Sequence, residues 1–368
     1  MNKKIVICVN TSWNIYNFRL NLARALKKEG YQVILVAPAD NYSKKLKEEF
    51  EFYDIYISNK GTNPKEDIKT LWQFYKLYKK IKPEIVLNYT IKPNIYGNIA
   101  CHLLGIKTIN NISGLGTVFI KESIVTKIVK LLYKLSLKNS SKVFFQNSDD
   151  KKLFIEHKLV IKNKCDILPG SGVDINKFSP VLYEKKDEIF RFLLIARVLW
   201  DKGIAEYVEA AIELKSMYNN IEFQLLGSID AVNKTAVPKE QIENWIDEKI
   251  INYLGTSDNV QEIIKQADCI VLPSYREGTP RTLLESASMA KPLITTNTVG
   301  CKDVVDDEIN GFLCEVKSSS SLKNAMNKMF LLEQNIRKEM GFAGRKKILE
   351  EYDEKIVIDK YLNCIKKL

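Results

Sequence analysis

The chain has 368 residues, 45% of them hydrophobic and 27% charged, which is typical of a globular protein and excludes a disordered or fibrous one. Its length exceeds what one hydrophobic core ordinarily holds and predicts two domains. The net charge of +11 is uneven, because residues 1–182 carry +15 and the remainder −4, so we expect only the first half to meet an anionic surface.

The first half of the chain alternates predicted strands with predicted helices. Short apolar runs predict the strands, and apolar residues at helical spacing predict the helices. The predicted strands span 5–9, 32–37, 84–88, 107–110 and 142–146, and the predicted helices include 18–28 and 69–80. The run 5–9 is short and is interpreted as a first strand, not as part of a signal peptide. This alternation predicts a parallel sheet covered by helices.

A second series of the same kind begins near residue 190. Its predicted strands span 190–196, 221–226, 251–254, 269–272 and 293–296, and one of its helices spans 259–266. The charged, poorly patterned stretch 180–188 separates the two series, so we expect an N-terminal domain over 1–182 and a C-terminal domain over 183–350. The predicted fold class is α/β, with two Rossmann-like domains that face each other across a cleft and bind ligands at the carboxyl ends of their strands.

Two cations follow the predicted strand 190–196, where the chain turns into a helix. Arg197 and Lys202 flank a short loop, and Gly203 opens a helix that extends to about residue 215. Such cations suit a diphosphate, because they donate charge-assisted hydrogen bonds to phosphate oxygens. The alternative is a pair of ordinary surface cations.

Two carboxylates bracket a Gly-Thr-Pro turn after the predicted strand 269–272. Glu277 lies in the loop, and Glu285, after seven intervening residues, lies about a turn and a half into the next helix. Thr279 suits the N-cap and Pro280 the first helical position, so backbone amides there face any bound anion. This arrangement suits a sugar nucleotide, whereas the alternative is a common pair of carboxylates on a solvated helix.

The segments 195–203 and 273–285 resemble the donor-binding half of family 4 retaining glycosyltransferases, which have the GT-B architecture. Further motifs resemble the bacterial subgroup that builds lipid-linked surface or glycoprotein oligosaccharides. These motifs span 89–97, 113–116, 144–147 and 170–174. The resemblance implies that the final helix, within 351–368, crosses back to the N-terminal domain.

The resemblance also implies roles for the donor-binding residues. Glu277 holds hydroxyls of the donor sugar, Glu285 holds the ribose, and Arg197 and Lys202 neutralise the diphosphate. Glu277, Arg197 and Lys202 are therefore the expected catalytic residues. The other donor-binding candidates are Gly227, Leu254, Gly255, Gly278, Thr279, Pro280, Arg281 and Thr282. Because no Asp-x-Asp sequence is present to clamp Mg²⁺ or Mn²⁺, we expect no metal and no other cofactor.

Acceptor-binding candidates lie in the N-terminal half. Lys92 and Asn94 are candidates, with local turn chemistry as the alternative; Asn17 and Arg19 suit an acceptor phosphate, with capping and surface charge as the alternative. Glycine permits close backbone approach, which makes Gly114 and Gly116 further candidates. Many relatives carry a histidine where this chain has Ile91, and isoleucine cannot do acid–base work. The proton acceptor is therefore left open.

The segment 124–135 has the pattern of an interfacial helix, with lysines 127, 130, 134 and 138 on one face and apolar residues opposite. The alternative is a core-packed helix with a solvated lysine face. The seven cysteines form no CxxC pair and the chain has two histidines, which favours a reduced cytoplasm and supplies no metal site. We expect the protein on the inner face of the cell membrane, with no nucleic-acid partner.

The expected function is metal-independent, retaining transfer of a sugar, an N-acetylhexosamine, from a UDP-sugar to a polyprenyl-diphosphate-linked saccharide. Two other classes are kept open. A UDP-sugar epimerase of the same shape would need several catalytic carboxylates and histidines. An inactive scaffold would bind nucleotide or membrane without chemistry, and Ile91 in place of the histidine leaves room for it.

Overall fold

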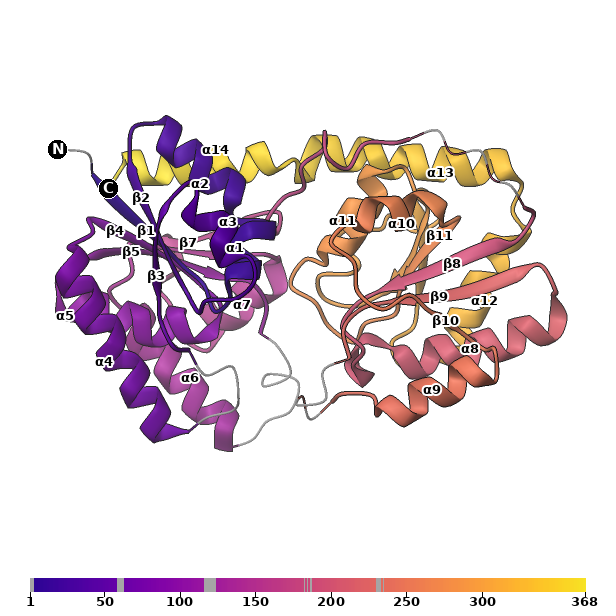
Figure 1. Ribbon diagram of the computed structural model, residues 1–368, viewed down its shortest axis with the longest axis horizontal. Coiled ribbons are helices and arrows are strands. Elements are labelled where there is room, and N and C mark those ends of the chain that lie inside the picture. The colour runs from indigo at the N-terminus through magenta and orange to yellow at the C-terminus, as the bar shows by residue number, and fades with distance from the viewer. Residues whose placement is uncertain are drawn as a thin grey trace. The chain divides into compact units, whose positions relative to one another are not determined.

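The computed structural model describes residues 3–57, 63–115, 124–181, 183, 185, 187–229, 233 and 235–368 (Figure 1). The chain forms two compact units, one of Met1–Ser171 with Lys355–Leu368 and one of Gly172–Glu354. The first boundary therefore lies before the predicted one at 182. The physical reason is that Val173 and Phe178 are buried in the core of the second unit, against Leu193 and Leu283.

The first unit is built on a seven-stranded sheet in which every neighbouring pair is parallel. The strand order is β3-β2-β1-β4-β5-β6-β7, so the order reverses between β1 and β4. The strands are β1 Lys4–Cys8, β2 Gln32–Ala37, β3 Glu51–Asp54, β4 Ile85–Tyr89, β5 Lys107–Ile112, β6 Lys142–Phe145 and β7 Cys165–Ile167. In such sheets ligands bind outside the carboxyl ends at the reversal, which directs attention to β1 and β4.

Helices cover both faces of this sheet (Figure 1). Alternate residues of β1 point to opposite faces, and both sets are buried: Ile5 and Ile7 in one apolar core, Val6 and Cys8 in another. This explains why the strands read as continuous apolar runs. The helical segments that precede the second unit are α1 Ser12–Phe18, α2 Leu20–Lys28, α3 Ser43–Lys47, α4 Pro64–Ile81, η1 Pro93–Gly97, α5 Asn98–Leu103, α6 Ile124–Leu137, α7 Ser148–Glu156 and η3 Lys162–Lys164.

The predicted helix 18–28 is wrong at its start. The structure has two helices, α1 capped by the Thr11 hydroxyl, which accepts from the Asn14 amide at 3.1 Å, and α2. They are separated at Arg19, whose backbone leaves the helical region with φ −131° and ψ −5°. Asn17 therefore lies in the last turn of α1, and Arg19 lies at the break.

The last helix of the chain, α14 Glu354–Lys366, belongs to the first unit. Its buried side chains recur every fourth residue, Val357, Tyr361 and Ile365, and they pack in the same core as Ile5 and Ile7. The predicted return of the final helix to the N-terminal domain is thus present in the structure (Figure 1).

The second unit repeats the architecture with a six-stranded parallel sheet in the order β10-β9-β8-β11-β12-β13. Its strands are β8 Phe190–Ile195, β9 Ile221–Leu226, β10 Asn252–Tyr253, β11 Cys269–Leu272, β12 Leu293–Thr296 and β13 Gly311–Cys314. Its helical segments are η4 Trp200–Lys202, α8 Ile204–Met217, α9 Lys239–Asp247, α10 Val260–Gln266, α11 Arg281–Ser288, α12 Ser319–Leu331, α13 Gln334–Lys347 and η5 Ile348–Tyr352. Here the order reverses between β8 and β11. The predicted α/β class with two Rossmann-like domains is confirmed.

Candidate functional site

The predicted donor-binding loops leave the second sheet side by side. β8 and β11 are parallel neighbours, with Phe192 opposite Cys269, and they flank the point where the strand order reverses. The loop after β8 carries Arg197 and Lys202, and the loop after β11 carries Glu277. Two loops that are nearly eighty residues apart in sequence thus meet at the edge where this kind of sheet binds ligands.

Lys202 and Glu277 form an ion pair between these loops, Nζ to Oε1. Their side chains are only 16% and 17% exposed, so water screens the pair weakly. The backbones are also joined, because the Asp201 carbonyl accepts from the Tyr275 amide at 3.0 Å and from the Ser274 hydroxyl at 3.2 Å. Arg197 is exposed on the first loop.

Gly203 makes this close approach possible. It ends η4 with φ +75°, a conformation that glycine adopts without penalty. A Cβ at this position would lie 2.1 Å from the Pro273 carbonyl oxygen. The glycine after Lys202 is therefore required by the contact between the two loops as well as by the turn.

Glu285 is held by a residue of its own helix. The Arg281 Nε donates to Glu285 Oε1 at 2.7 Å, one helical turn away, and the side chains are 15% and 12% exposed. The predicted cap is wrong: Pro280 occupies the N-cap with no side-chain hydrogen bond, and Arg281 is the first helical residue. Extended backbone at Pro280, with ψ 107°, delays the helix by one position beyond the one predicted.

The glycine-containing turn that carries Glu277 is supported from behind by the loop after β12. The Glu277 amide donates to the Val299 carbonyl at 3.1 Å, and the Thr298 hydroxyl donates to the Tyr275 carbonyl at 3.0 Å. Gly278 and Pro280 are buried, while Thr279 and Thr282 are half-buried beside them. No motif in 297–301 would have identified this support from the sequence.

Gly227, Leu254 and Gly255 lie at the carboxyl ends of β9 and β10, beside β8. The Gly227 amide donates to the Gly255 carbonyl at 2.8 Å, and the Leu254 amide donates to the Leu225 carbonyl at 2.8 Å. The Tyr253 hydroxyl closes the group by donating to the Gly227 carbonyl at 2.8 Å. The structure thus gathers these three predicted donor residues on the same edge as Arg197 and Lys202.

Glu206 and Tyr275 belong to this region and were not singled out from the sequence. The Tyr275 hydroxyl donates to Glu206 Oε1 at 2.7 Å, which ties the β11 loop to α8. Burial raises the pKa of Tyr275, and the hydrogen bond to Glu206 adds to the rise. The sequence signal that could have identified them is their closeness to predicted site residues. Tyr275 lies two residues before Glu277, and Glu206 lies three residues after Gly203.

The acceptor candidates of the first unit differ in their surroundings. The Lys92 Nζ is 2.8 Å from Asp67 Oδ1, and both side chains are nearly buried. Asn94 is buried, and its amide donates to the Asn111 carbonyl at 2.7 Å. Both side chains thus have partners within the first unit, and these partners lie 25 and 17 residues away in sequence, beyond the local turn of the alternative.

The other acceptor candidates are more varied. Asn17 donates to the Trp13 carbonyl at 3.0 Å. Arg19 is buried at the start of α2. Gly114 has φ +136°, and Gly116 lies outside the described residues. Ile91 packs against a core next to η1.

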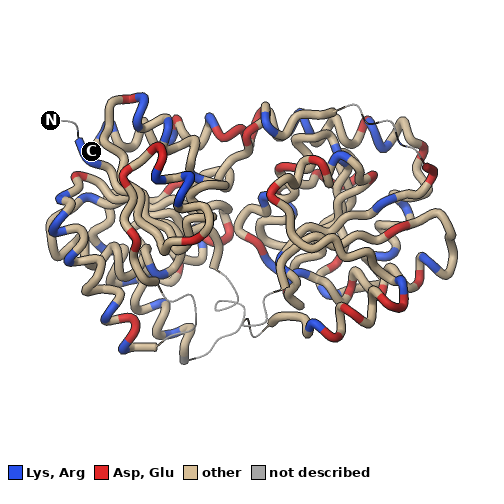
Figure 2. Tube along the Cα trace, in the orientation of Figure 1, with Lys and Arg blue, Asp and Glu red and all other residues tan. Residues whose placement is uncertain are grey.

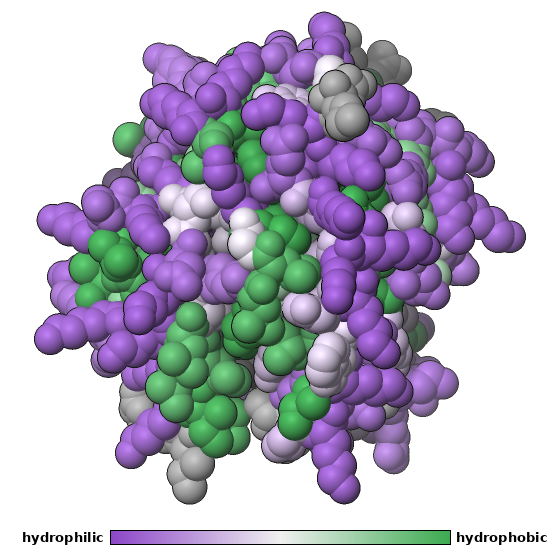
Figure 3. Space-filling view, turned by 90° about the vertical axis from the view of Figure 1, so that its left-hand side faces the viewer, coloured by the Kyte–Doolittle hydropathy of each residue, from purple (hydrophilic) through white to green (hydrophobic). Residues whose placement is uncertain are grey.

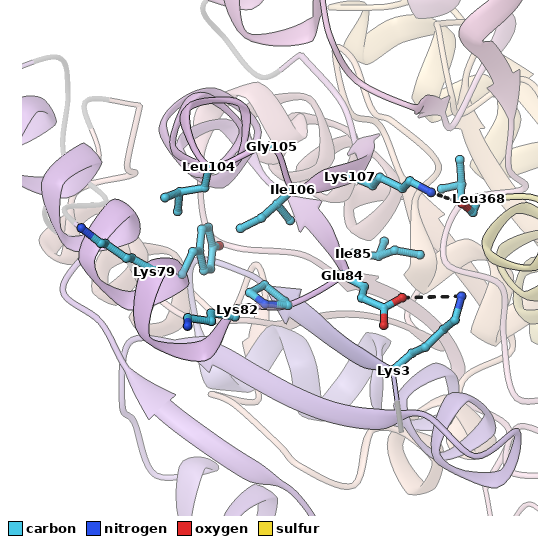
Figure 4. Close-up of a pocket in the computed structure, with 12 residues that line it drawn as sticks. Lys3, Lys79, Lys82, Glu84, Ile85, Leu104, Gly105, Ile106, Lys107 and Leu368 are labelled. Carbon is cyan, nitrogen blue, oxygen red and sulfur yellow. Dashed lines mark hydrogen bonds and ion pairs between the residues drawn. The ribbon is translucent and has the colours of Figure 1, made fainter. Parts of the chain in front are cut away.

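A pocket of about 490 Å³ lies at the opposite edge of the first sheet (Figure 4). It is lined by Ile85 and Lys107, the first residues of β4 and β5, together with Lys3, Lys79 and Lys82. Lys3 pairs with Glu84 at 3.5 Å. Ligands of parallel sheets bind at carboxyl ends, and this pocket is at the amino-terminal ends, so it is separate from the candidate site.

The chain matches two families and resembles characterised relatives. Residues 175–347 match "Glycosyl transferases group 1", and residues 4–147 match "Glycosyl transferase 4-like". The chain is 27% identical to the N,N'-diacetylbacillosaminyl-diphospho-undecaprenol alpha-1,3-N-acetylgalactosaminyltransferase of Campylobacter jejuni, covering 95% of this chain and 94% of the relative. It is 31% identical to the UDP-Gal:alpha-D-GlcNAc-diphosphoundecaprenol alpha-1,3-galactosyltransferase of Escherichia coli, covering 71% of this chain and 70% of the relative.

Solved structures show the same fold over the whole chain. Anabaena HepE, in complex with UDP and glucose, has a TM-score of 0.79 at 15% identity and covers 100% of both chains. Sucrose-phosphate synthase of Thermosynechococcus elongatus has a TM-score of 0.81 at 16% identity and covers 100% of this chain and 99% of that one. The predicted GT-B architecture is confirmed by these likenesses. Together with the family matches and the Escherichia coli relative, they show that the chain belongs to the group 1 glycosyltransferases and is a hexosyltransferase.

Proposed function

We propose that this glycosyltransferase moves an N-acetylhexosamine from a UDP-sugar to a saccharide carried on polyprenyl diphosphate. The observation that carries the proposal is the alignment, over 95% of this chain, with a Campylobacter jejuni enzyme named for an N-acetylgalactosaminyl donor group and a diphospho-undecaprenol acceptor. The Escherichia coli relative is named for UDP-Gal and a diphosphoundecaprenol acceptor, which supports a UDP-sugar donor and a polyprenyl-diphosphate acceptor.

The Lys202–Glu277 ion pair supports a specific use of the two charges. On donor binding, the diphosphate oxygens accept hydrogen bonds from Lys202 and Arg197. Glu277 accepts a hydrogen bond from a hydroxyl group of the donor sugar. The Arg281–Glu285 pair orients the Glu285 carboxylate, which holds the ribose. These cations stabilise the charge that develops on the departing diphosphate, which we expect to be the main source of catalysis.

We propose that the reaction proceeds with retention at the anomeric carbon and without a metal. The acceptor hydroxyl attacks the face that the diphosphate leaves, and the departing phosphate oxygen assists it. Metal independence follows from the role given to Lys202 and Arg197, which do the work of a divalent ion. Transfer in excess EDTA at the rate found in added Mg²⁺ is the expected result, and activity that returns only with Mn²⁺ or Mg²⁺ would contradict it.

The function is tested by offering a panel of UDP- and other nucleotide sugars with polyprenyl-diphosphate saccharides extracted from membranes. One UDP-N-acetylhexosamine is expected to give a lengthened lipid-linked product, whose new linkage NMR identifies as retained. Conversion of a UDP-sugar into its epimer without acceptor would favour the epimerase instead. Nucleotide binding with no product from any donor would favour the scaffold.

We also propose that α6 docks the first unit on an anionic membrane leaflet. One face of α6 packs in the core through Val129 and Tyr133. A second apolar stripe is exposed, 40–57% by residue, and consists of Val125, Ile128, Leu131 and Leu135. Lysines 127, 130 and 134 alternate with it, which is the pattern of an interfacial helix. Within the described residues, no helix is both long enough and apolar enough to cross a bilayer.

The outer helices of this unit support the proposal further. On α4, Ile68 is 60% and Trp72 56% exposed. α4 and α6 both pack against α5 and η1, so they cover the same side of the sheet. Figure 3 shows apolar patches among hydrophilic side chains on the face seen from the left of Figure 1, and Figure 2 shows basic residues along the outer helices of the first unit.

Cosedimentation with vesicles containing phosphatidylglycerol tests the docking surface. Leu131→Gln with Leu135→Gln is expected to reduce binding about tenfold or more, because two exposed apolar side chains leave the interface. Ile212→Gln with Leu331→Gln, equally exposed in the second unit, is the matched control and should bind as the unaltered protein does. Equal loss in both variants, or binding unaffected by salt and by lipid charge, would contradict the proposal.

A further inference from the structure

Arg19 reaches across the point where the strand order of the first sheet reverses. It stands between α1 and α2, in the segment that follows β1, and its guanidinium carbon lies 4.2 Å from the ring centre of Tyr89. Tyr89 is the last residue of β4, the strand that pairs with β1 at the reversal. Arg19 thus contacts the strand across the reversal of the first sheet, as Lys202 contacts the loop across the reversal of the second.

Arg19 is buried, and the residues that the structure describes give it no carboxylate partner. It is 4% exposed, and its Nη1 donates to the Phe18 carbonyl at 3.3 Å. Its Nε has no hydrogen-bond partner among the residues that the structure describes. By contrast, Lys92, Lys202 and Arg281 each pair with a carboxylate. A buried cation without a partner is costly, and stacking on one tyrosine ring offsets only part of that cost.

The surroundings of Arg19 would accept an anion. The Tyr89 ring lies 6.1 Å from that of Tyr361 on α14, and the Tyr361 hydroxyl accepts from the Asn111 amide at 3.1 Å. The positive charge of Arg19 acts on both tyrosines, where it opposes part of the rise in pKa that burial causes. The two tyrosines and the asparagine carry no negative charge that would repel a phosphate.

We infer that Arg19 binds a phosphate group of the acceptor at the carboxyl edge of the first sheet, whereas the second sheet binds the diphosphate of the donor. Resting on the function proposed above, the ligand is the diphosphate of the polyprenyl acceptor. Arginine matches phosphate oxygens with two parallel donors, and Nε is a donor for which the described residues supply no acceptor. Tyr361 of α14 packs against Tyr89, so this helix supports the site.

The first experiment uses inorganic pyrophosphate and the full chain, with UDP at saturation so that the donor site is occupied. Calorimetry should show pyrophosphate binding that Arg19→Gln weakens about 10- to 100-fold, the loss expected for charge-assisted hydrogen bonds. Arg24→Gln, which alters an exposed α2 arginine paired with Glu49, is the matched control and should bind normally. Equal pyrophosphate affinity in the Arg19→Gln variant would overturn the inference.

A second measurement needs no variant, so it stands even if Arg19→Gln does not fold. Pyrophosphate should slow hydrogen exchange in the unaltered protein at residues 18–21 and 89–90, and no protection there would overturn the site. In transfer assays Arg19→Lys should raise the KM for the lipid-linked acceptor and leave UDP affinity unchanged. Pyrophosphate binding with an unaltered acceptor KM would assign the site to free phosphate and overturn the acceptor assignment. Absence of transfer with intact pyrophosphate binding would instead count against the proposed function alone.

Discussion

Single side chains decide what the donor site can do, and Glu277 is the sharpest case. It is paired with Lys202 and only 17% exposed. Glu277→Ala is expected to lower kcat on the order of 10³-fold or more, because it removes the group that holds the donor sugar. UDP affinity should largely survive, since Lys202 is then released from its ion pair and stays available to phosphate. Calorimetry with UDP and turnover assays give the two quantities.

Glu308→Ala is the control for that substitution. Glu308 is also paired with a lysine, Lys328, but its side chain is 68% exposed and lies away from the site residues in sequence and on the sheet. This variant should transfer sugar at the normal rate. Unchanged turnover in Glu277→Ala would refute the role given to Glu277.

Tyr275 is expected to act as a positioning residue through Glu206. Glu206 is buried, its Oε1 accepts from Tyr275, and its Oε2 has no partner within the described part of the chain. Tyr275→Phe therefore leaves a buried carboxylate without a described donor, which costs about 1–3 kcal/mol of unfolding free energy. Chemical denaturation measures this cost.

A double-mutant cycle separates this effect from simple loss of packing. If the pair acts as proposed, Tyr275→Phe combined with Glu206→Leu should lose less stability than the two single losses added together. Tyr275→Phe should also lower kcat more than it raises the donor KM, because the β11 loop carries Glu277. If the stability losses of the two single variants add in the double variant and the kinetics are unaltered, the hydrogen bond has no positioning role.

Among the elements, the turn from η4 into α8 depends on Gly203. Gly203→Ala is expected to displace the loop and to lower stability by more than the ~1 kcal/mol that a left-handed alanine alone costs. The excess arises from the Pro273 carbonyl, 2.1 Å from the added Cβ. Gly105→Ala is the matched control, because Gly105 has φ +68° with nothing within 4 Å of the added atom. Equal losses of Tm in the two variants would show that the close approach of the Pro273 carbonyl does not cause the extra destabilisation of Gly203→Ala.

Much of the fold was predictable because its strands are buried on both faces. The bounds predicted for β2, β9, β11 and β12 agree with the structure, since continuous apolar runs are bounded there by turn residues. β3 escaped prediction because its sequence, Glu-Phe-Tyr-Asp, is a half-buried edge strand that ends in charges. α1, Ser12–Phe18, also escaped prediction, because only Ser12 and Ile15 of its seven residues are buried and the apolar pattern of a helix is weak there.

The site was predictable where charge and turn residues coincide at a strand end. Lys202 and Glu277 meet as partners across two loops, which spacing along the chain cannot reveal. Tyr275 with Glu206, and the Val299 support of Glu277, depend on tertiary contacts and carry no local signal. Lys92 shows the converse, since a cation within the family-like segment 89–97 proves to be paired with Asp67 of α4.

At the scale of the whole molecule, Lys291 makes stability depend on pH. It is largely buried, its Nζ donates to the carbonyls of Lys265 and Ala267 at 2.8 and 2.7 Å, and burial lowers its pKa from 10.5 to about 8 despite the attraction of Asp268. Between these values the unfolded chain binds more protons than the folded one. The contribution of Lys291 to the free energy of unfolding therefore rises with pH from about 8 to 10.5 and is constant below 8.

Lys291→Met tests this by removing the titrating group. The difference in unfolding free energy between the unaltered protein and the variant should grow in favour of the unaltered protein as pH rises from about 8 to 10.5. Lys239→Met, which removes a lysine whose side chain is 73% exposed, is the control and should not reproduce this growth. A flat difference for Lys291→Met as well would show that its pKa is ordinary.

The chain passes between its two units at two places that are hydrogen-bonded to each other, Val173 beside Asp353, with the Glu354 amide donating to the Val173 carbonyl at 3.0 Å. The second unit is thus an uninterrupted insert within the first. During synthesis the ribosome finishes this insert before it releases α14, the last helix. Until then the apolar face around Ile5 and Ile7 is without its cover. The domain that begins first is completed last, and a nascent chain stalled near residue 350 should display that face to chaperones.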